Sequence, residues 1–213
     1  MIRILVIDDH IIVHRGLRQI VGEEPDMTVA GEARSSLEGL SLAQTQPWDA
    51  VVLDLSMPGR GGLEVLKELK RERPKLPVLI LSMYPEEQYA IRSLRLGASG
   101  YLTKESAPEE LIKAIRKIVT GGRYVSSSLA ETLAGRMVAA DRVAGQPPHE
   151  TLSDREFLVL RLIASGKTVA DIGSELALGV KTIHTYRTRI LEKLGMKTNA
   201  ELTQYAIRNR LVE

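Results

Sequence analysis

Five short apolar runs alternate strictly with five longer amphipathic segments over the first 121 residues of the chain. Near-continuous Val, Ile and Leu in these runs indicates strands buried on both faces, which is typical of a parallel sheet covered by helices. The alternation therefore predicts an α/β domain built on a doubly wound, five-stranded parallel sheet. We expect strands over residues 2–7, 28–33, 50–55, 78–83 and 100–103, and helices over residues 10–23, 36–46, 62–73, 86–96 and 108–119.

A different pattern begins near residue 151 and is entirely helical. The second and third of its helical segments are separated only by Ala177, Leu178 and Gly179, a short turn typical of a helix-turn-helix. We expect an all-α, four-helix domain over residues 151–213, with helices at 154–165, 169–176, 180–194 and 199–210. Three of these helices begin with capping pairs, which are Ser153 with Glu156, Thr168 with Asp171, and Thr198 with Glu201.

Residues 122–150 resemble neither pattern and are predicted to be a linker that is partly helical. Leu129, Leu133 and Met137 recur every four residues, which indicates a short helix. Gly145 and the two prolines after it end any helix. The chain therefore divides into a first domain over 1–121, a linker over 122–150 and a second domain over 151–213.

Composition narrows the class of protein. With 44% hydrophobic and 26% charged residues, the chain has an ordinary globular composition. The absence of cysteine excludes disulfides, thiolate metal sites and cysteine nucleophiles, and it fits a reducing cytoplasm. No apolar run approaches the roughly 18 residues of a membrane span. Because Asp8 and Asp9 follow the first run at once, no signal peptide is expected. We expect a cytoplasmic protein with no membrane partner.

Polar side chains follow four of the apolar runs at the point where each run ends. Asp8 and Asp9 follow the first, Asp54 the third, Ser82 the fourth and Lys104 the fifth. Each of these polar residues, taken alone, could equally cap a helix, form a turn or simply be solvated. Together they fall on one edge, because the carboxyl ends of parallel strands line the crevice where ligands bind.

This set of residues suits phosphoryl transfer. Converging carboxylates suit Mg²⁺, and a carboxylate can attack phosphorus to form an aspartyl phosphate. A metal ion and a lysine would neutralise the phosphoryl oxygens. Asp54, on the central run, is the natural nucleophile, whereas Asp8 and Asp9 are better suited to the metal.

The strings IRILVIDDH, VVLDLSMPG, LILSM and GYLTK resemble, in this order, the receiver domain of two-component response regulators, with its CheY-like fold. The resemblance covers residues 1–121. It implies that Asp54 accepts phosphate from a histidine kinase. It also implies that Asp9, Asp54 and the backbone carbonyl of Ser56 bind Mg²⁺, with Asp8 assisting through water.

Three further roles follow from the same resemblance. Lys104 would contact the phosphoryl group, Ser82 would turn toward it, and Tyr101 would follow as the switch residue. The sequence departs from the common pattern at three places. Glu105 replaces a frequent proline after the lysine, so the sequence leaves undecided whether the peptide bond there is cis. Gly61 replaces an aspartate that could cap a helix, and the hydroxyl residue is Ser rather than Thr.

The predicted helix over 180–194 has an apolar stripe of Ile183, Ile190 and Leu194, with Tyr186 at its edge, and a polar, mostly cationic opposite face. Such a face suits the major groove, where Lys and His donate to guanine and Thr can contact thymine. By itself this face would equally fit a solvated amphipathic helix. Seven basic and two acidic residues lie from Lys181 to Arg210, a charge balance that favours phosphate-backbone binding. The candidate DNA contacts are Lys181, Thr182, His184, Thr185, Arg187, Thr188 and Arg189.

The strings LSDREFLVLRLIASG and TVADIGSELALGVKTIHTYRTRILEKLGMKTNAEL resemble the DNA-binding domain of NarL/FixJ (LuxR-type) regulators over residues 152–202. The resemblance implies that 180–194 is the recognition helix and 169–176 its support, and that the helix from Asn199 is a dimer contact. His184 stands where members of the family vary, so operator preference does not transfer. His10 and His149 have no motif around them and are interpreted as surface or capping residues.

The leading hypothesis is a DNA-binding response regulator whose phosphorylation on Asp54 shifts homodimerisation and DNA binding, and so controls transcription. A non-enzyme is expected. An aspartyl-phosphate phosphatase of the haloacid-dehalogenase type would need a second Asp where Ser56 stands. A flavodoxin-like cofactor carrier would need a phosphate cradle in place of Asp8, Asp9 and His10. A LuxR-type sensor of a small signal molecule would need a closed apolar pocket rather than a carboxylate rim.

Overall fold

The computed structural model describes residues 1–131, 134, 147–209 and 211–212 of the chain. The chain forms two compact units, Met1–Val138 and Ala139–Glu213. The domain limits inferred from the sequence stay predictions. Leu133, Met137 and Gly145, on which the predicted linker helix and its end depend, lie outside the described residues.

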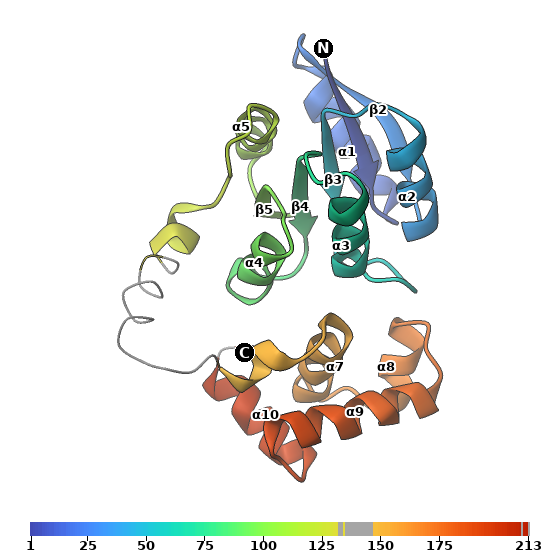
Figure 1. Ribbon diagram of the computed structural model, residues 1–213, viewed down its shortest axis with the longest axis vertical. Coiled ribbons are helices and arrows are strands. Elements are labelled where there is room, and N and C mark those ends of the chain that lie inside the picture. Colours follow the sequence, from blue (N-terminus) through green and yellow to red (C-terminus); the bar gives the residue numbers. More distant parts are fainter. Residues whose placement is uncertain (132–133, 135–146, 210, 213) are drawn as a thin grey trace. The chain divides into compact units, whose positions relative to one another are not determined.

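The first unit alternates strands and helices as predicted (Figure 1). All its strand pairs are parallel, in the order β2-β1-β3-β4-β5, so the order reverses between β1 and β3. The doubly wound fold class is confirmed. The strands are β1 (Ile2–Ile7), β2 (Met27–Ala33), β3 (Ala50–Leu53), β4 (Val78–Ser82) and β5 (Gly100–Thr103). The helices are α1 (Ile11–Gly22), α2 (Ser36–Thr45), α3 (Gly62–Glu72), α4 (Glu86–Arg95) and α5 (Pro108–Val119).

Both faces of the sheet are covered by helices. On one face, Leu17 of α1 and Ile115 of α5 join a single core cluster with Ile4 and Val52 of the strands. On the other face, α2 approaches β1 so closely that a Cβ on Gly39 would lie 2.7 Å from the side chain of Ile7. Strands β3 and β4 are therefore buried along their whole length, whereas the edge strand β2 is half-buried over most of its residues.

The first part of the predicted linker is fastened to the first unit. Tyr124 N donates to the carbonyl of Ser99 at 2.9 Å and forms a bridge beside β5. Ser126 Oγ donates to Glu86 at the start of α4, at 2.5 Å, and Leu129 is only 2% exposed. These residues extend the first unit beyond α5.

The second unit is helical, with α7 in contact with both α9 and α10. Ser153 and Thr168 form complete capping boxes with Glu156 and Asp171, and the Thr198 side chain accepts from Glu201 N, so all three predicted caps are confirmed. Helix α9 ends at Gly195 in the left-handed region, with φ 65°. The elements are η1 (Pro148–Thr151), α7 (Asp154–Ala164), α8 (Val169–Glu175), α9 (Val180–Leu194) and α10 (Asn199–Arg208). Across the described part of the chain, every helix is too short or too polar to cross a bilayer.

The interpretation of His149 as a surface or capping residue is wrong. His149 is 9% exposed, and its Nδ1 lies 2.9 Å from the hydroxyl of Tyr205 in α10. Its ring also packs against Phe157 of α7, with the ring centroids 6.3 Å apart. His149 therefore ties η1 to two helices of the second unit.

Candidate functional site

The parallel register brings the predicted polar residues to one rim. Ile7 pairs with Leu53, so Asp8 and Asp54 leave neighbouring strands at the same level. Asp54 N donates to the carbonyl of Ile7 at 2.9 Å, and Lys104 N donates to the carbonyl of Ser82 at 2.9 Å. These backbone bonds continue the strand ladders and fix where the side chains begin.

Asp8, Asp9 and Asp54, hereafter the acidic cluster, lie together at this rim, and the ammonium of Lys104 contacts two of them. Lys104 Nζ lies 2.7 Å from Asp8 Oδ2 and 2.8 Å from Asp54 Oδ2. Asp8 and Asp54 are 2% and 1% exposed, whereas the Asp9 side chain is 28% exposed. Two carboxylates thus share one lysine with a third carboxylate nearby, which leaves excess negative charge in a largely buried pocket.

Burial and the neighbouring charges act in opposite directions on the pKa values of Asp54 and Lys104. Burial raises the pKa of the Asp54 carboxyl, and the Lys104 hydrogen bond offsets this only in part. Burial alone would lower the pKa of Lys104, but its hydrogen bonds to Asp54 and Asp8 outweigh that effect and raise it. Lys104 is therefore a permanent cation, and ionised Asp54 is held in the pocket at a free-energy cost.

Ser82 and Tyr101, the predicted hydroxyl and switch residue, are both fully buried and meet at Tyr84. Ser82 Oγ accepts a hydrogen bond from Tyr84 N at 3.2 Å, and Tyr101 Oη donates to the carbonyl of Tyr84 at 2.8 Å. The Tyr84 ring in turn stacks on Tyr89 of α4, with the ring centroids 4.6 Å apart. The segment between β4 and α4 is thus bonded to both predicted switch residues.

The departures from the receiver pattern have simple structural outcomes. Every peptide bond in the described residues is trans, including the bond from Lys104 to Glu105. Gly61 precedes α3 without a side-chain cap. Ser56 N donates to Asp54 Oδ1 at 3.1 Å, so the backbone of Ser56 lies against the carboxylate.

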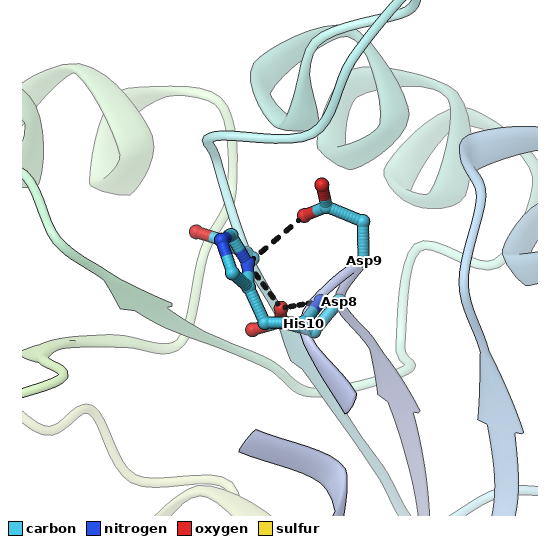
Figure 2. A group of neighbouring side chains, drawn as sticks. Asp8, Asp9 and His10 are labelled. Atoms are coloured by element: carbon cyan, nitrogen blue, oxygen red, sulfur yellow. Dashed lines mark hydrogen bonds and ion pairs between the residues drawn. The ribbon is translucent and has the colours of Figure 1, made fainter. Parts of the chain in front are cut away.

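Two histidines support the rim, and the sequence interpretation missed their part in it. His10 has a 55% exposed side chain, as expected for a surface residue, but its Nδ1 lies 3.1 Å from both Asp8 Oδ1 and Asp9 Oδ1 (Figure 2). His14 is 2% exposed, and its Nε2 lies 2.6 Å from the carbonyl of Asp8. His10 directly precedes α1 and His14 lies in its first turn, so their position right after Asp8 and Asp9 was the available signal.

Gly62 is a further residue that the sequence interpretation missed. A Cβ at this position would lie 2.1 Å from the carbonyl oxygen of Asp54 and 2.6 Å from Leu55 Cα. Only glycine lets α3 begin this close to the loop that carries Asp54.

Helix α9 presents the predicted polar face to solvent. Ile183 and Ile190 are fully buried, whereas Lys181, Thr182, His184, Thr185, Thr188 and Arg189 are exposed. Arg187 is half-buried, and its Nε donates to Asn199 Oδ1 at 2.6 Å, which ties α9 to the start of α10. Gly173 of α8 allows the turn before α9 to pass close by, since a Cβ there would lie 2.7 Å from the carbonyl of Leu178.

Two family descriptions match the chain, one for each unit. Residues 4–116 match the response regulator receiver domain. Residues 150–206 match the bacterial regulatory proteins of the luxR family. The chain is a LuxR-type two-component response regulator. The predicted family is thereby confirmed.

Relatives of this LuxR-type response regulator align over nearly the whole chain. Response regulator UvrY of Escherichia coli (strain K12) is 34% identical over 211 residues, which cover 99% of this chain and 96% of that protein. Response regulator GacA of Pseudomonas aeruginosa is 35% identical over 213 residues, covering 100% and 99%. The response regulator RcsB of Salmonella typhimurium has a TM-score of 0.59 at 28% identity, covering 97% and 98%. RcsB bound to promoter rprA with the phosphomimetic BeF3- has a TM-score of 0.65 at 26% identity, covering 96% and 97%.

The response regulator thus joins a receiver domain, which takes its signal from a histidine kinase, to a DNA-binding domain. It regulates transcription by phosphorylation, as the sequence predicted.

Proposed function

We propose that Asp54 is the phosphoacceptor. The observation that carries this proposal is the pair of contacts from Lys104 Nζ to Asp8 and Asp54. An oxygen of the Asp54 carboxylate attacks the phosphorus atom carried by the kinase histidine. The P–N bond breaks, and its electron pair returns to the imidazole. Lys104 then neutralises one oxygen of the phosphoryl group, because its ammonium already stands beside the acceptor.

Asp8, Asp9, Asp54 and the backbone carbonyl of Ser56 would hold Mg²⁺. Hard carboxylate and carbonyl oxygens are the donors that Mg²⁺ prefers. Asp9 Oδ1 is buried and has no hydrogen-bond partner among the described residues, so it is available for a cation. Bound Mg²⁺ would supply positive charge for the phosphoryl oxygens, and the excess negative charge of the acidic cluster fits that requirement.

Ser82 and Tyr101 would carry the signal away from Asp54. A phosphoryl group on Asp54 offers new acceptor oxygens to the Ser82 hydroxyl. Turning that hydroxyl removes the bond from Tyr84 N, and Tyr84 also holds the Tyr101 hydroxyl. The segment continues into Glu86, which accepts from Ser126 of the linker. Phosphorylation is thereby coupled to the linker through a short run of hydrogen bonds.

The domain limits that fit this mechanism are a receiver over 1–121, a linker over 122–150 and a DNA-binding domain over 151–213. Within the last, α9 would enter the major groove with α8 in support. The side chains that would contact DNA are Lys181, Thr182, His184, Thr185, Arg187, Thr188 and Arg189.

Phosphorylation would favour a homodimer on DNA. One solved structure of RcsB, 27% identical with a TM-score of 0.59, is of two RcsB dimers bound to two parallel DNAs. The α10 helix would supply the dimer contact, and the two copies would read half-sites roughly 10 base pairs apart or a multiple of that. A regulator that acts on chromosomal DNA would be in the cytoplasm. Because Ser56 stands where a phosphatase would need its second Asp, the protein acts as a switch rather than as an enzyme.

Labelling with a small phosphodonor and Mg²⁺ tests the acceptor. The wild-type protein should gain an acid-stable, base-labile phosphoryl adduct, and Asp54→Asn should gain none. Asp49→Asn, which changes an exposed aspartate at the other end of β3, is the matched control and should label normally. Equal labelling of wild type and Asp54→Asn would overturn the assignment.

Binding to duplex DNA tests the recognition helix. Lys181→Ala and His184→Ala should both weaken binding to an operator, and raising the salt concentration should weaken it steeply, because phosphate contacts release counterions. Unchanged affinity of both variants would exclude α9 as the reading element. A flat salt response would contradict DNA as the partner.

A further inference from the structure

One basic residue of α9 is held in place by its neighbour in α10. Arg187 is half-buried, whereas the other predicted DNA contacts of this helix are exposed. Its Nε donates to Asn199 Oδ1 at 2.6 Å. Arg187 follows His184 by three residues, which places it about 60° around the helix from that residue, at the border between the exposed face and the buried stripe. Its guanidinium is therefore already oriented at the edge of the reading face.

The partner that orients Arg187 is a neutral amide. An amide oxygen accepts a hydrogen bond from a guanidinium but leaves its positive charge in place. Other basic side chains of this unit are neutralised, since Lys193 Nζ lies 2.6 Å from a carboxylate oxygen of Glu156 and Lys167 pairs with a carboxylate as well. Arg187 forms no ion pair with any residue in the described part of the chain. Its charge is therefore available to an anion.

The guanidinium keeps most of its hydrogen-bond donors. Arginine carries five N–H groups, and the bond to Asn199 uses the one on Nε. The two Nη groups of Arg187 make no hydrogen bond within residues 1–131, 134, 147–209 and 211–212. Paired N–H groups of a guanidinium match the oxygens of a phosphate, which they bind through two parallel hydrogen bonds. The side chain thus suits a phosphate beside the groove that α9 would enter.

The first turn of α10 gives Asn199 a fixed position. Thr198 Oγ1 accepts from Glu201 N at 3.2 Å and caps the helix. Thr203 Oγ1 donates to the carbonyl of Asn199 at 3.0 Å. A long side chain that is ordered before binding loses less conformational freedom when it binds. A fixed Asn199 can therefore lower the entropic cost of a phosphate contact made by Arg187.

We propose that Asn199 is a positioning residue for DNA binding, whose side-chain oxygen holds Arg187 so that its guanidinium clamps a phosphate of the DNA backbone. This inference rests on the proposed role of α9 as the recognition helix. Phosphate contacts set how a protein sits on the duplex and carry no sequence information themselves. Asn199 therefore strengthens binding to DNA of any sequence.

Titration of a labelled mixed-sequence DNA duplex with the full-length protein, at a series of salt concentrations, tests the proposal. Arg187→Ala should weaken binding by roughly tenfold or more. It should also lower the slope of log affinity against log salt by about 0.9 for each bound copy, because one phosphate contact is lost. Asn199→Ala keeps the charge of Arg187 and should weaken binding by about two- to tenfold, the cost of ordering one long side chain. Gln204→Ala, which removes an exposed amide from the same helix, is the matched control and should bind as wild type.

A double-mutant cycle separates this positioning role from a purely structural one. If Asn199 acts only through Arg187, Asn199→Ala should have no further effect on affinity in the Arg187→Ala protein. Arg187→Lys keeps the positive charge but lacks Nε, so it should bind like Asn199→Ala. The two changes together should lose no more affinity than either one alone.

The outcomes separate this inference from the function on which it rests. The positioning role is refuted if Asn199→Ala binds as tightly as wild type, if its loss adds fully to that of Arg187→Ala, or if Gln204→Ala loses as much. An unchanged salt slope in Arg187→Ala would refute the phosphate contact. If Lys181→Ala weakens binding and Asn199→Ala does not, α9 still binds DNA and only this inference fails. If neither Lys181→Ala nor Arg187→Ala changes the affinity, the proposed recognition helix fails and this inference fails with it.

Discussion

Replacing Asp54 by asparagine should stabilise the receiver in the absence of Mg²⁺. The acidic cluster holds three carboxylates whose ligand atoms lie within 4.8 Å of one another. At that separation and an effective dielectric constant of about 20, two like charges repel by roughly 3.5 kcal/mol. Neutralising Asp54 removes its repulsion with the two other carboxylates and relieves the burial of one charge.

The same substitution also loses an attraction. Lys104 Nζ lies 2.8 Å from Asp54, which corresponds to roughly 6 kcal/mol at a dielectric constant of about 20. The two lost repulsions exceed this by roughly 1 kcal/mol, and relief of desolvation adds to the difference. We therefore expect Asp54→Asn to raise the free energy of unfolding by about 1 to 3 kcal/mol at pH 7.

The pH dependence has a definite sign. Burial raises the pKa of Asp54 above its usual 3.8, so the ionised carboxylate costs the folded state stability above that raised pKa. The advantage of Asp54→Asn should be complete at pH 7. It should shrink as the pH falls through the folded-state pKa and below 3.8, where the wild-type carboxyl is protonated in both states.

Urea unfolding of the full-length protein, followed by fluorescence, gives the measurement. Trp48 is the one tryptophan of the chain and lies 7% exposed in the first unit, so it reports on the receiver alone. Glu23→Gln, an exposed carboxylate at the end of α1, is the control and should change stability by less than about 0.5 kcal/mol. Added Mg²⁺ should stabilise wild type and reduce its deficit. Equal or lower stability of Asp54→Asn without Mg²⁺ would refute the electrostatic reasoning.

Three other substitutions test separate parts of the structure. Lys104→Met should destabilise the receiver by about 3 to 5 kcal/mol in the same fluorescence assay, opposite in sign to Asp54→Asn, because it leaves buried carboxylates without their counter-ion; a stabilised variant would contradict this. Gly62→Ala should abolish phosphoryl labelling and lower receiver stability, because its Cβ would overlap the Asp54 carbonyl. The control Gly16→Ala, which has open space around its Cβ, should label normally. Normal labelling of Gly62→Ala would show that the loop can shift. Lys193→Met should lower the thermal stability of the second unit, measured by circular dichroism, by about 1 kcal/mol at pH 7. Burial raises the pKa of Glu156, but hydrogen bonds from Lys193 and Ser153 outweigh that effect and lower the pKa. The stabilisation by this ion pair is therefore present above pH 4.5 and disappears as the pH falls through the folded-state pKa. An identical pH profile of stability in Lys193→Met would exclude the ion pair as the source.

Most of the fold followed from local patterns in the sequence. Apolar runs placed every strand of the first unit, because strands buried on both faces need uninterrupted Val, Ile and Leu. The third run was predicted to continue to Leu55, but β3 ends at Leu53. Leu55 is 5% exposed without belonging to the strand, so hydrophobic pattern alone could not separate burial from strand pairing.

The residues of the rim were predictable because parallel strands deliver their carboxyl ends to one edge. Asp8, Asp54 and Lys104 meet there as expected. The role of His10 in the rim depended on the rotamer of a single exposed side chain, which no local pattern specifies. His149 was misread for another reason, because its partner Tyr205 lies 56 residues away in the chain.

The caps of the second unit were predictable because a capping box is complete within four residues. The close approach of Gly62 to Asp54 was not, because the glycine is read from the sequence as an ordinary helix start. Only the three-dimensional path of the loop places the Asp54 carbonyl where a Cβ would be. Interactions between residues near in sequence were thus recovered, and distant contacts required coordinates.

Genome-wide mapping of bound DNA, with wild-type protein and with Asp54→Asn expressed at equal levels, tests the central claim most directly. Phosphorylation of Asp54 is proposed to favour the DNA-bound dimer, so the wild-type protein should occupy a defined set of sites under kinase-activating conditions. Asp54→Asn should lose most of that occupancy. Identical occupancy by the two proteins would contradict control of DNA binding through Asp54.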